Sequence, residues 1–201
     1  MIRALHPYKP KLVVIGNGLA GARLVEDILA GDPDIFDITM FGDKPYGNYN
    51  RILLSNVLNG FQDAQEILLN PLAWYKENNI TLHAGQWITR IDREAKTVFA
   101  GKVGVTYDNL VFATGSRPFI PPIPGTTHHG VFAFRTLDDC RNIAEYARNC
   151  KKALVIGGGL LGLEAAKGLM THDVEVTVVE MAPWLMSVQL DDGGGAFTKR
   201  R

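Results

Sequence analysis

The stretch Lys11-Leu-Val-Val-Ile-Gly-Asn-Gly-Leu-Ala-Gly21 decides the fold of the first half of this chain. Its apolar run predicts a buried strand, and its glycines follow the pattern Gly-x-Gly-x-x-Gly, which joins a strand directly to a helix. Gly16 permits a tight turn, Gly18 leaves space for phosphate oxygens beside the backbone, and Gly21 lets the helix approach the strand. This arrangement places a pyrophosphate at a helix N-terminus.

A second copy of the pattern occupies the stretch Ala153-Leu-Val-Ile-Gly-Gly-Gly-Leu-Leu-Gly162. Again a short apolar run predicts a buried strand, and the glycines open the next helix. One bare copy is a weak signal for a dinucleotide site. Two copies in one chain, each between a predicted strand and a predicted helix, predict two dinucleotides held side by side.

Each copy is followed by an acidic residue near the end of the next predicted strand. Asp43 takes this place in the first half and Glu180 in the second. A carboxylate there accepts hydrogen bonds from ribose hydroxyls. Glu180 would also repel a 2′-phosphate, so the second site is predicted to prefer NADH to NADPH. For Asp43, which follows Gly42, ordinary turn chemistry is the alternative.

Composition and charge exclude several other classes of function. The 201 residues allow one large domain or two small ones, and the apolar fraction of 46% is normal for a globular protein. With 21 basic and 21 acidic residues the formal net charge is zero, so no long-range field favours nucleic acid as a partner. Because no long apolar run is present, we expect a cytoplasmic protein without a signal peptide or a membrane span.

The cysteines and histidines form no metal-binding or redox pattern. Cys140 and Cys150 are the only two cysteines, and the rotation of one predicted helix places them on different faces. His128 and His129 stand in a predicted linker without suitably spaced ligands, and His83 lies in a predicted meander strand. We therefore expect no disulfide and no metal site.

The first half predicts a βαβ unit followed by a small antiparallel meander. Apolar periodicity and glycine breaks support these assignments. The short helix that contains Trp74 and Tyr75 is predicted to use both aromatic rings for packing. The expected elements are a strand at 11–16, a helix at 19–30, a strand at 35–41, helices at 51–59 and 71–79, meander strands between 80 and 106, and a strand at 109–113.

Four prolines between Arg117 and Gly125 favour an extended connection, because proline continues neither a helix nor a central strand. We place the domain boundary there. The predicted fold is α/β, with two Rossmann-like three-layer domains at residues 1–118 and 119–201, the meander inserted in the first, and both domains incomplete at the C-terminus. The second domain is expected to contain a helix at 137–149, a strand at 153–156, a helix at 160–170 and a strand at 174–180, and no helix is expected over 193–201.

Further motifs give the chain a family resemblance. Tyr49-Asn-Arg-Ile-Leu-Leu-Ser55 precedes Ala113-Thr-Gly-Ser-Arg-Pro118, and the second glycine pattern continues to Glu164. In this order, over about residues 10 to 190, the chain resembles the two-dinucleotide flavoprotein reductases related to glutathione and ferredoxin reductases. Within that superfamily it is most similar to the flavoprotein part of the NAD(P)H-dependent assimilatory nitrite reductase large subunit, through residues 49–55 and Pro183-Trp-Leu-Met186.

The resemblance implies FAD in the first site and NAD(P)H, with NADH favoured, in the second. It also implies that Arg51 lies close to the isoalloxazine and that Trp87 flanks the adenine. An arginine at a helix start can hold pyrophosphate or flavin oxygens with several donors. The alternatives are a solvated cation for Arg51 and simple core packing for Trp87. The predicted cofactor-binding residues are Gly16, Gly18, Leu19, Ala20, Gly21, Asp43, Arg51, Ser55, Trp87, Ala113, Thr114 and Gly115 for FAD, and Gly157, Gly159, Leu160, Leu161, Gly162 and Glu180 for the nicotinamide nucleotide.

Glu164 is the candidate catalytic residue. The resemblance implies that this carboxylate faces the dinucleotide crevice near the nicotinamide and the flavin. In many relatives it pairs with a lysine one residue after the position of Ser55, where this chain has Asn56. A Lys–Glu pair is therefore not expected, and a helix-surface or capping role is the alternative for Glu164.

The expected function is that of an FAD-dependent NAD(P)H oxidoreductase of the nitrite reductase type, acting in nitrate assimilation. The cofactors would carry the chemistry. Because no redox cysteine pair follows the first domain, electrons would pass to another centre, to an acceptor protein or domain absent from this chain, or to oxygen. Whether the chain forms a homodimer is left open. The alternatives are a ferredoxin- or rubredoxin-reductase-like electron-transfer component and a nucleotide-binding fragment without turnover. Because the pattern ends abruptly after Leu190, we expect a truncated or frameshifted reading frame or a deliberately shortened chain.

Overall fold

The structure, a computed structural model, describes residues 8–199 and divides into two compact units. The first unit comprises the chain up to Asn50 and Leu68–Arg117, and the second comprises Arg51–Ile67 and the chain from Pro118 onward. The division thus differs from the predicted ranges in residues 51–67 and in Pro118, which belong to the second unit. Which nucleotide each domain binds stays a prediction.

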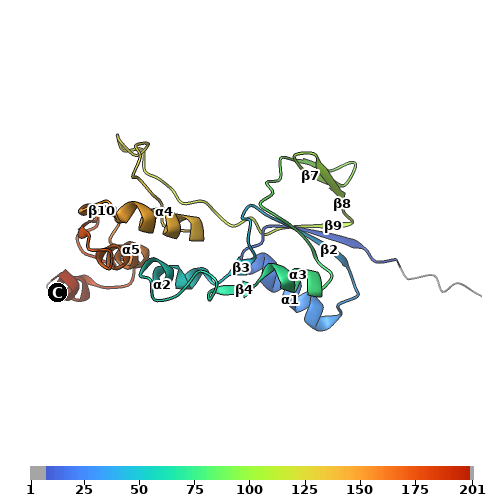
Figure 1. Cartoon of the computed structure of the whole chain (residues 1–201), viewed down its shortest axis with the longest axis horizontal. Coiled ribbons are helices and arrows are strands. Elements are labelled where there is room, and N and C mark those ends of the chain that lie inside the picture. Colours follow the sequence, from blue (N-terminus) through green and yellow to red (C-terminus); the bar gives the residue numbers. More distant parts are fainter. Residues whose placement is uncertain (1–7, 200–201) are drawn as a thin grey trace, which may run out of the picture. The chain divides into compact units, whose positions relative to one another are not determined.

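A four-stranded parallel sheet forms the centre of the first unit (Figure 1). Its order is β5 (Thr81–Ala84), β2 (Asp37–Gly42), β1 (Lys11–Ile15) and β9 (Asn109–Phe112). All three pairings are parallel, so the carboxyl ends of the four strands lie at one edge. Because β1 has β2 on one side and β9 on the other, the strand order reverses at β1, and ligands of open α/β sheets bind at such a point.

Two layers cover this sheet, one on each face. The helices α1 (Leu19–Gly31) and α3 (Leu72–Glu77) lie on one face, and the antiparallel meander lies on the other (Figure 1). The side chains of β1 point alternately to the two faces of the sheet, so each face has its own core. Leu12 and Val14 pack in the helix-side core, and Val13 and Ile15 pack in the meander-side core. The meander consists of β6 (Arg90–Asp92), β7 (Thr97–Ala100) and β8 (Val103–Thr106).

The predicted strands and helix at 11–16, 19–30, 35–41 and 109–113 are confirmed to within two residues. The assignment of Thr81–Ala84 to the meander was wrong. These residues form β5, which pairs in parallel with β2 after the α3 crossover, and the preceding Ile80 is buried in the helix-side core. His83 therefore belongs to the central sheet, where its ring stacks on Phe41 with a centroid distance of 4.7 Å.

One small antiparallel pair was not predicted. The strand β3 (Asn48–Tyr49) pairs with β4 (Leu68–Asn70), which directly precedes α3. Their length of two or three residues gives too few positions for a period to be visible in the sequence.

The second unit contains a two-stranded parallel sheet made of β10 (Lys152–Ile156) and β11 (Glu175–Val179). The helix α5 (Leu160–Met170) connects the two strands and packs against both. On the other face, Leu154, Ile156 and Val179 are exposed. This sheet is therefore covered on one face only, and the three-layer arrangement predicted for this domain is not found among the described residues.

The segment 51–67 packs against helices of the second unit. It contains the 3-10 turn η1 (Arg51–Leu53) and the helix α2 (Leu54–Leu58), which lies against α5 and against α4 (Leu137–Ala147). Leu54 and Leu58 are buried, and the Cys140 Sγ donates to the Leu54 carbonyl oxygen at 3.5 Å. These contacts explain why the segment separates from its sequence neighbours.

Two further predictions were wrong in this unit. The helix α6 (Asp192–Lys199) forms where none was expected, because the Asp191 side chain accepts a hydrogen bond from the Gly194 N–H and Trp184 lies against Gly195. Cys150 lies beyond the end of α4, so it does not share a helix with Cys140. Both cysteines are free thiols.

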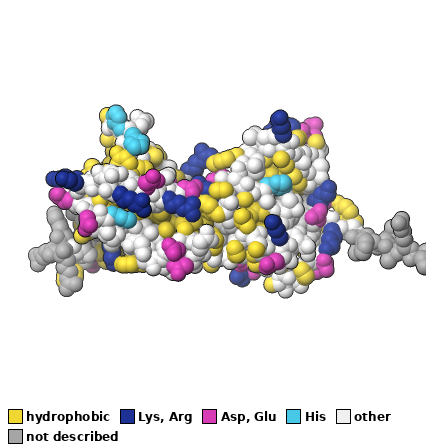
Figure 2. Space-filling model, viewed as in Figure 1, with side chains coloured by type: hydrophobic (Ala, Val, Ile, Leu, Met, Phe, Trp, Pro, Cys, Tyr) yellow, Lys and Arg dark blue, Asp and Glu magenta, His cyan; other side chains and the backbone are white. Residues whose placement is uncertain are grey.

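Charged side chains of both signs are interspersed on the visible face of each unit (Figure 2). Within residues 8–199, no helix combines the length and the apolar character that crossing a membrane requires.

Candidate dinucleotide-binding sites

The first glycine loop lies at the carboxyl end of β1, between β2 and β9. Gly16 has a φ of +119°, its N–H donates to the Phe41 carbonyl oxygen at 2.8 Å, and a Cβ there would lie 2.1 Å from the Ala113 carbonyl oxygen. A Cβ at Gly21 would lie 2.1 Å from the Gly16 carbonyl oxygen. Glycine is therefore required at both positions by close backbone approach.

Gly18 is different, because a Cβ there would meet no atom within 4 Å. It is the N-cap residue of α1, and no side chain caps this helix end. The first N–H groups of a helix need external acceptors, and an anion satisfies them well. The open space beside Gly18, Leu19 and Ala20 thus fits the phosphate groups of a nucleotide.

The second glycine loop repeats this geometry. Gly157 has a φ of +113°, its N–H donates to the Val179 carbonyl oxygen at 2.8 Å, and a Cβ at Gly162 would lie 1.9 Å from the Gly157 carbonyl oxygen. Gly159 is the uncapped N-cap residue of α5 and has no atom within 4 Å of an added Cβ. Leu160 and Leu161, the next two residues, are exposed in the first turn of α5.

Glu180 is hydrogen-bonded to the second glycine loop. Its Oε2 accepts from the Gly158 N–H at 2.6 Å, and its Oε1 accepts from the Ala182 N–H at 2.9 Å. These bonds, first that from Ala182, lower the pKa of the carboxyl group below its ordinary value. The carboxylate therefore stays ionised beside the loop, where it can accept from a ribose hydroxyl.

Asp43 is exposed directly after β2, in a segment that pairs with residues 85–86. The Gly85 N–H donates to the Lys44 carbonyl oxygen at 2.8 Å and the Gln86 N–H to that of Gly42 at 2.9 Å. This pairing brings Trp87 to the same edge of the sheet as Asp43.

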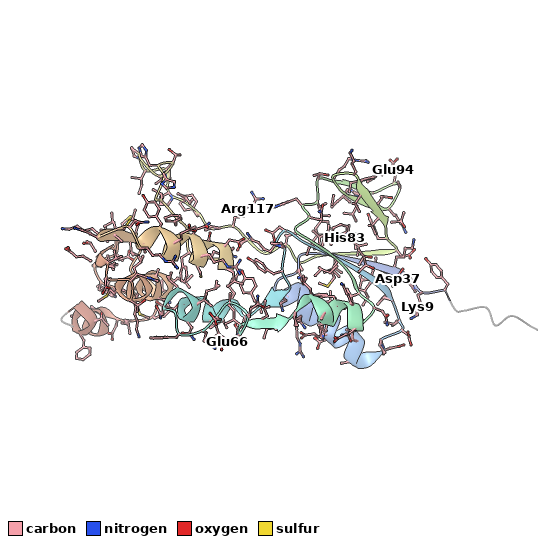
Figure 3. All side chains as sticks on the ribbon, viewed as in Figure 1. Lys9, Asp37, Glu66, His83, Glu94 and Arg117 are labelled. Carbon is pink, nitrogen blue, oxygen red and sulfur yellow. The ribbon has the colours of Figure 1, made fainter. Side chains whose placement is uncertain are left out.

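The segment after β9 reaches the same edge. The Ala113 N–H donates to the Ile15 carbonyl oxygen at 2.8 Å, and Thr114 and Gly115 are exposed. Figure 3 shows Arg117 at the end of this segment, and its guanidinium carbon lies 4.8 Å from the centroid of the Trp87 ring. Trp87 is 56% exposed, which excludes simple core packing as its role.

The comparisons with known proteins identify the family. A family model described as pyridine nucleotide-disulphide oxidoreductase matches residues 10–201. The chain belongs to this family. Proteins of this family typically bind FAD and NAD(P)H.

Individual relatives agree with this membership and with the predicted resemblance to nitrite reductases. The chain is 50% identical over 188 residues to a nitrite reductase [NAD(P)H] of Bacillus subtilis (strain 168). The matched residues cover 93% of this chain and 23% of that protein. It is 45% identical over 184 residues to the assimilatory nitrate reductase electron transfer subunit of the same strain, covering 91% and 24%. The chain thus spans about a quarter of the length of these relatives.

A solved structure shows the same fold. The NADH:rubredoxin oxidoreductase from Clostridium acetobutylicum matches with a TM-score of 0.84 and 28% identity, over 96% of this chain and 50% of that one. The α/β architecture with a parallel sheet and a small antiparallel meander is therefore confirmed, and it corresponds to about half of an FAD-dependent reductase structure.

The remaining predicted residues of this family member lie in the second unit. Arg51 is exposed in η1 and Ser55 is half-buried in α2, so neither belongs to the compact unit that contains the first glycine loop. Glu164 is half-buried in the second turn of α5, and no ion pair or hydrogen bond of its side chain is found within residues 8–199. The Asn56 side chain donates to the Gln62 Oε1 at 2.9 Å. Asn56 thus stabilises the turn after α2, and a catalytic role for Glu164 stays a prediction.

Sequence reasoning missed Asn17 and Tyr75. Asn17 occupies a variable position of the glycine pattern, and Tyr75 was assigned to packing. In the structure the Tyr75 hydroxyl donates to the Asn17 Oδ1 at 2.7 Å. An aromatic residue on a short helix gives no signal of such a bond, because the contact depends on how α3 crosses the sheet.

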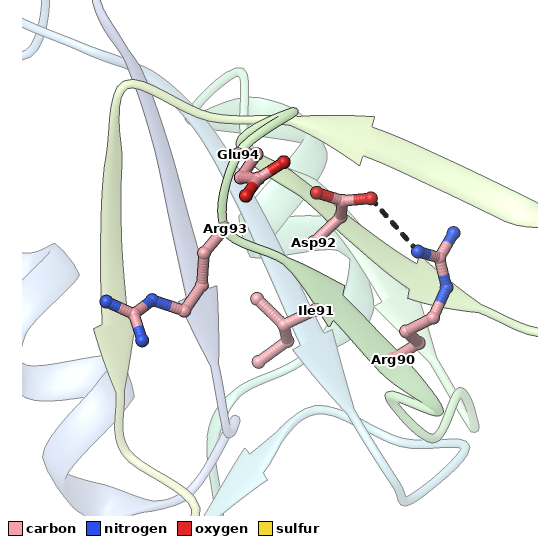
Figure 4. Close-up of a pocket in the computed structure, with 5 residues that line it drawn as sticks. All are labelled: Arg90, Ile91, Asp92, Arg93 and Glu94. Carbon is pink, nitrogen blue, oxygen red and sulfur yellow. Dashed lines mark hydrogen bonds and ion pairs between the residues drawn. The ribbon is translucent and has the colours of Figure 1, made fainter.

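A hollow beside β6 is unrelated to the predicted site residues (Figure 4). It is lined by Arg90, Ile91, Asp92, Arg93 and Glu94, and Arg90 forms an ion pair with Asp92 at 3.1 Å. Within residues 8–199, no group of three or more histidine, cysteine and acidic side chains could hold a metal ion.

Proposed function

We propose that this chain is the FAD- and NAD(P)H-binding part of an oxidoreductase of the nitrite reductase type. The observation that carries the proposal is the repeated loop geometry. In each unit a parallel strand is followed by a helix whose N-terminus no side chain caps, and the N-cap glycine has no atom within 4 Å of an added Cβ. Bound FAD would supply the redox chemistry by accepting electrons from NADH. The residues of the chain bind and orient the two nucleotides.

In the first unit, the α1 N-terminus would hold the FAD pyrophosphate beside Gly18. Asp43 would accept from a ribose hydroxyl, and the stacked pair of Trp87 and Arg117 would flank the base. All of these residues lie at the edge of the sheet where the strands end. Thr114 and Gly115, exposed at the same edge, would border the nucleotide.

In the second unit, the α5 N-terminus would hold the pyrophosphate of the nicotinamide nucleotide beside Gly159. Glu180, ionised and fixed by two backbone N–H groups, would accept from the adenosine 2′-hydroxyl and repel a 2′-phosphate. NADH is therefore the proposed substrate. The family resemblance implies that FAD would be bound by Arg51 and Ser55. It also implies that Glu164 would be the catalytic residue.

Electrons would leave to a separate acceptor protein or domain. The similarity to proteins named nitrite reductase and nitrate reductase electron transfer subunit supports a role in nitrate assimilation. A rubredoxin-reductase-like electron-transfer component is the second candidate, supported by the match to the clostridial NADH:rubredoxin oxidoreductase.

The visible absorption spectrum of the purified full chain tests the proposal. We expect the chain mixed with FAD to retain it through gel filtration, and the flavin absorption to bleach when NADH is added without oxygen. Gly18→Val should abolish FAD retention, because the new side chain would fill the space for phosphate. Gly31→Val is the matched control, since Gly31 ends the same helix and also has no atom within 4 Å.

Loss of FAD in the wild-type chain would contradict the proposal and favour a fragment without turnover. Retention of FAD without bleaching by NADH would contradict the assignment of the second site. Supplying nitrite reductase domains or an oxidised rubredoxin as acceptor then separates the two candidate functions by which one accepts electrons.

A further inference from the structure

A buried hydroxyl group lies behind the first glycine loop. Tyr75 is 1% exposed on α3, and its hydroxyl donates to the Asn17 Oδ1 at 2.7 Å while it accepts from the Asn48 N–H at 3.3 Å. Asn17 stands between Gly16 and Gly18, and Asn48 ends the segment that begins at the carboxyl end of β2. One hydroxyl thus joins the glycine loop to the segment that carries Asp43.

A chain of buried amides continues from this hydroxyl. The Asn48 Nδ2 donates to the Asn70 Oδ1 at 3.0 Å, and the Asn70 Nδ2 donates to the Glu26 Oε1 on α1 at 2.9 Å. Asn48 and Asn70 are only 3% and 4% exposed. Buried amides are costly unless they are hydrogen-bonded, so this network defines one arrangement of the segments that it connects.

Close backbone contacts show how tightly the segment from 42 to 48 is held. A Cβ at Gly42 would lie 2.9 Å from the Asn17 Cβ, and a Cβ at Gly47 would lie 1.9 Å from the Asn70 carbonyl oxygen. The segment therefore begins against Asn17 and ends against Asn70. Asp43, directly after Gly42, has its distance from the glycine loop fixed by these contacts.

We propose that Tyr75 is a positioning residue for the nucleotide site of the first unit. Through Asn17 and Asn48 its hydroxyl fixes the spacing between the loop that holds the pyrophosphate and the acid that holds the ribose. It also orients the Asn17 amide, because the oxygen end faces Tyr75 and the amino end is left to donate to a ligand. This inference rests on the proposed binding of FAD at this site.

The protonation state of Tyr75 suits this role. Burial raises the pKa of the phenol above its ordinary value, and the hydrogen bonds from Tyr75 to Asn17 and from Asn48 only partly oppose this effect. The hydroxyl group therefore remains a donor to Asn17 over the whole physiological pH range.

The test compares Tyr75→Phe with the wild-type chain in two measurements. The first is FAD affinity, from the quenching of flavin fluorescence, and we expect about ten-fold weaker binding, equivalent to about 1.4 kcal/mol. The second is hydrogen exchange of the Gly16 amide in the protein without FAD. This amide donates to the Phe41 carbonyl oxygen, and we expect its exchange to be faster when the loop loses its support.

A double-mutant cycle with Asn17→Ala separates positioning from general destabilisation. If Tyr75 acts through Asn17, Tyr75→Phe should weaken FAD binding little further in the Asn17→Ala background. Tyr107→Phe is the matched control, because Tyr107 packs against the core on the opposite face of the same sheet. It should leave FAD affinity and Gly16 exchange unchanged.

FAD binding by Tyr75→Phe within two-fold of wild type, unchanged Gly16 exchange, or fully additive effects in the cycle would each overturn the inference. If the wild-type chain binds no FAD, the proposed function fails instead. Gly16 exchange in the FAD-free protein still decides whether Tyr75 holds the loop.

Discussion

Replacing Gly162 by alanine should detach α5 from the strand that precedes it. The added Cβ would lie 1.9 Å from the Gly157 carbonyl oxygen, far inside the 3.4 Å at which ordinary van der Waals contact begins. The backbone fixes the position of the Cβ, and the oxygen is a backbone atom, so no side-chain rotation relieves the contact. The helix must move away from the loop, and the packing of α5 on β10 and β11 weakens with it.

The cost should approach the upper end of what overpacking does in protein cores, about 3 kcal/mol. For a compact unit of the size of the second unit, that corresponds to a fall in the melting temperature of about 12–24 °C. Such a loss is a large fraction of the stability of a typical domain, about 5–15 kcal/mol. We therefore expect the second unit of Gly162→Ala to unfold at clearly lower temperature or urea concentration.

Gly159→Ala is the matched control within the same loop. Its Cβ meets no protein atom within 4 Å, and the change at a helix N-cap should cost less than about 1 kcal/mol. It should instead weaken NADH binding, roughly ten-fold, because the methyl group enters the proposed phosphate space.

Thermal unfolding followed by circular dichroism and NADH titration by fluorescence measure the two effects separately. Equal melting temperatures for Gly162→Ala and wild type would refute the reasoning about the loop. NADH affinity of Gly159→Ala equal to that of wild type would refute the assignment of the phosphate space.

Three further predictions concern single side chains. Glu180→Gln should lower the preference for NADH over NADPH in a competition titration. Because the pKa of Glu180 is lowered in the folded state, the wild-type chain should be more stable than the variant above pH 4.5. Acid unfolding should show that this advantage is lost as the pH falls through the lowered pKa. Burial raises the pKa of Cys140 to about 12, so at pH 8 a chromogenic thiol reagent should modify Cys150 only, and both cysteines in denaturant. Thr136→Ala should destabilise the second unit by about 1 kcal/mol in urea unfolding, because the Thr136 side chain and Asp139 form a capping box at the start of α4.

The strand–turn–helix units could be predicted because their signals are local. The apolar runs before Gly16 and Gly157 are long enough to show a buried strand, and each glycine has a fixed task in the turn that follows. The close backbone approach that both loops share, at Gly21 and at Gly162, corresponds to the third glycine of each pattern. Local patterns therefore located both loops and the helices behind them.

The errors arose where a long-range contact decides the structure. The sequence of β5 predicts a meander strand, because a run of four residues does not reveal whether its partner strand is parallel or antiparallel. The parallel pairing with β2 places it in the central sheet. The segment 51–67 lies in sequence between two strands of the first sheet, β2 and β5, yet the burial of Leu54 and Leu58 joins it to the second unit. The bond from Tyr75 to Asn17 likewise connects residues far apart in the sequence.

The two glycine loops have the same local geometry but different surroundings. The loop geometry is nearly the same in both units, but the surroundings differ. A Cβ at Gly16 would lie 2.1 Å from the carbonyl oxygen of Ala113, directly after β9, whereas a Cβ at Gly157 would have no atom within 4 Å. In the proposed function, the capacity to hold a pyrophosphate would thus depend on the strand, turn and helix alone.

If both loops hold a pyrophosphate as proposed, we expect the choice of nucleotide to come from the segment after the second strand of each unit, where the surroundings diverge. In the first unit this segment pairs with residues 85–86 and is held through Asn17 and Tyr75, and Asp43 is exposed at the same edge of the sheet as Trp87. In the second it folds back onto the loop itself, with the Met186 N–H donating to the Gly158 carbonyl oxygen at 2.8 Å and Glu180 bound to the same glycine. Exchanging these segments should therefore change which nucleotide each unit prefers while leaving both glycine loops folded.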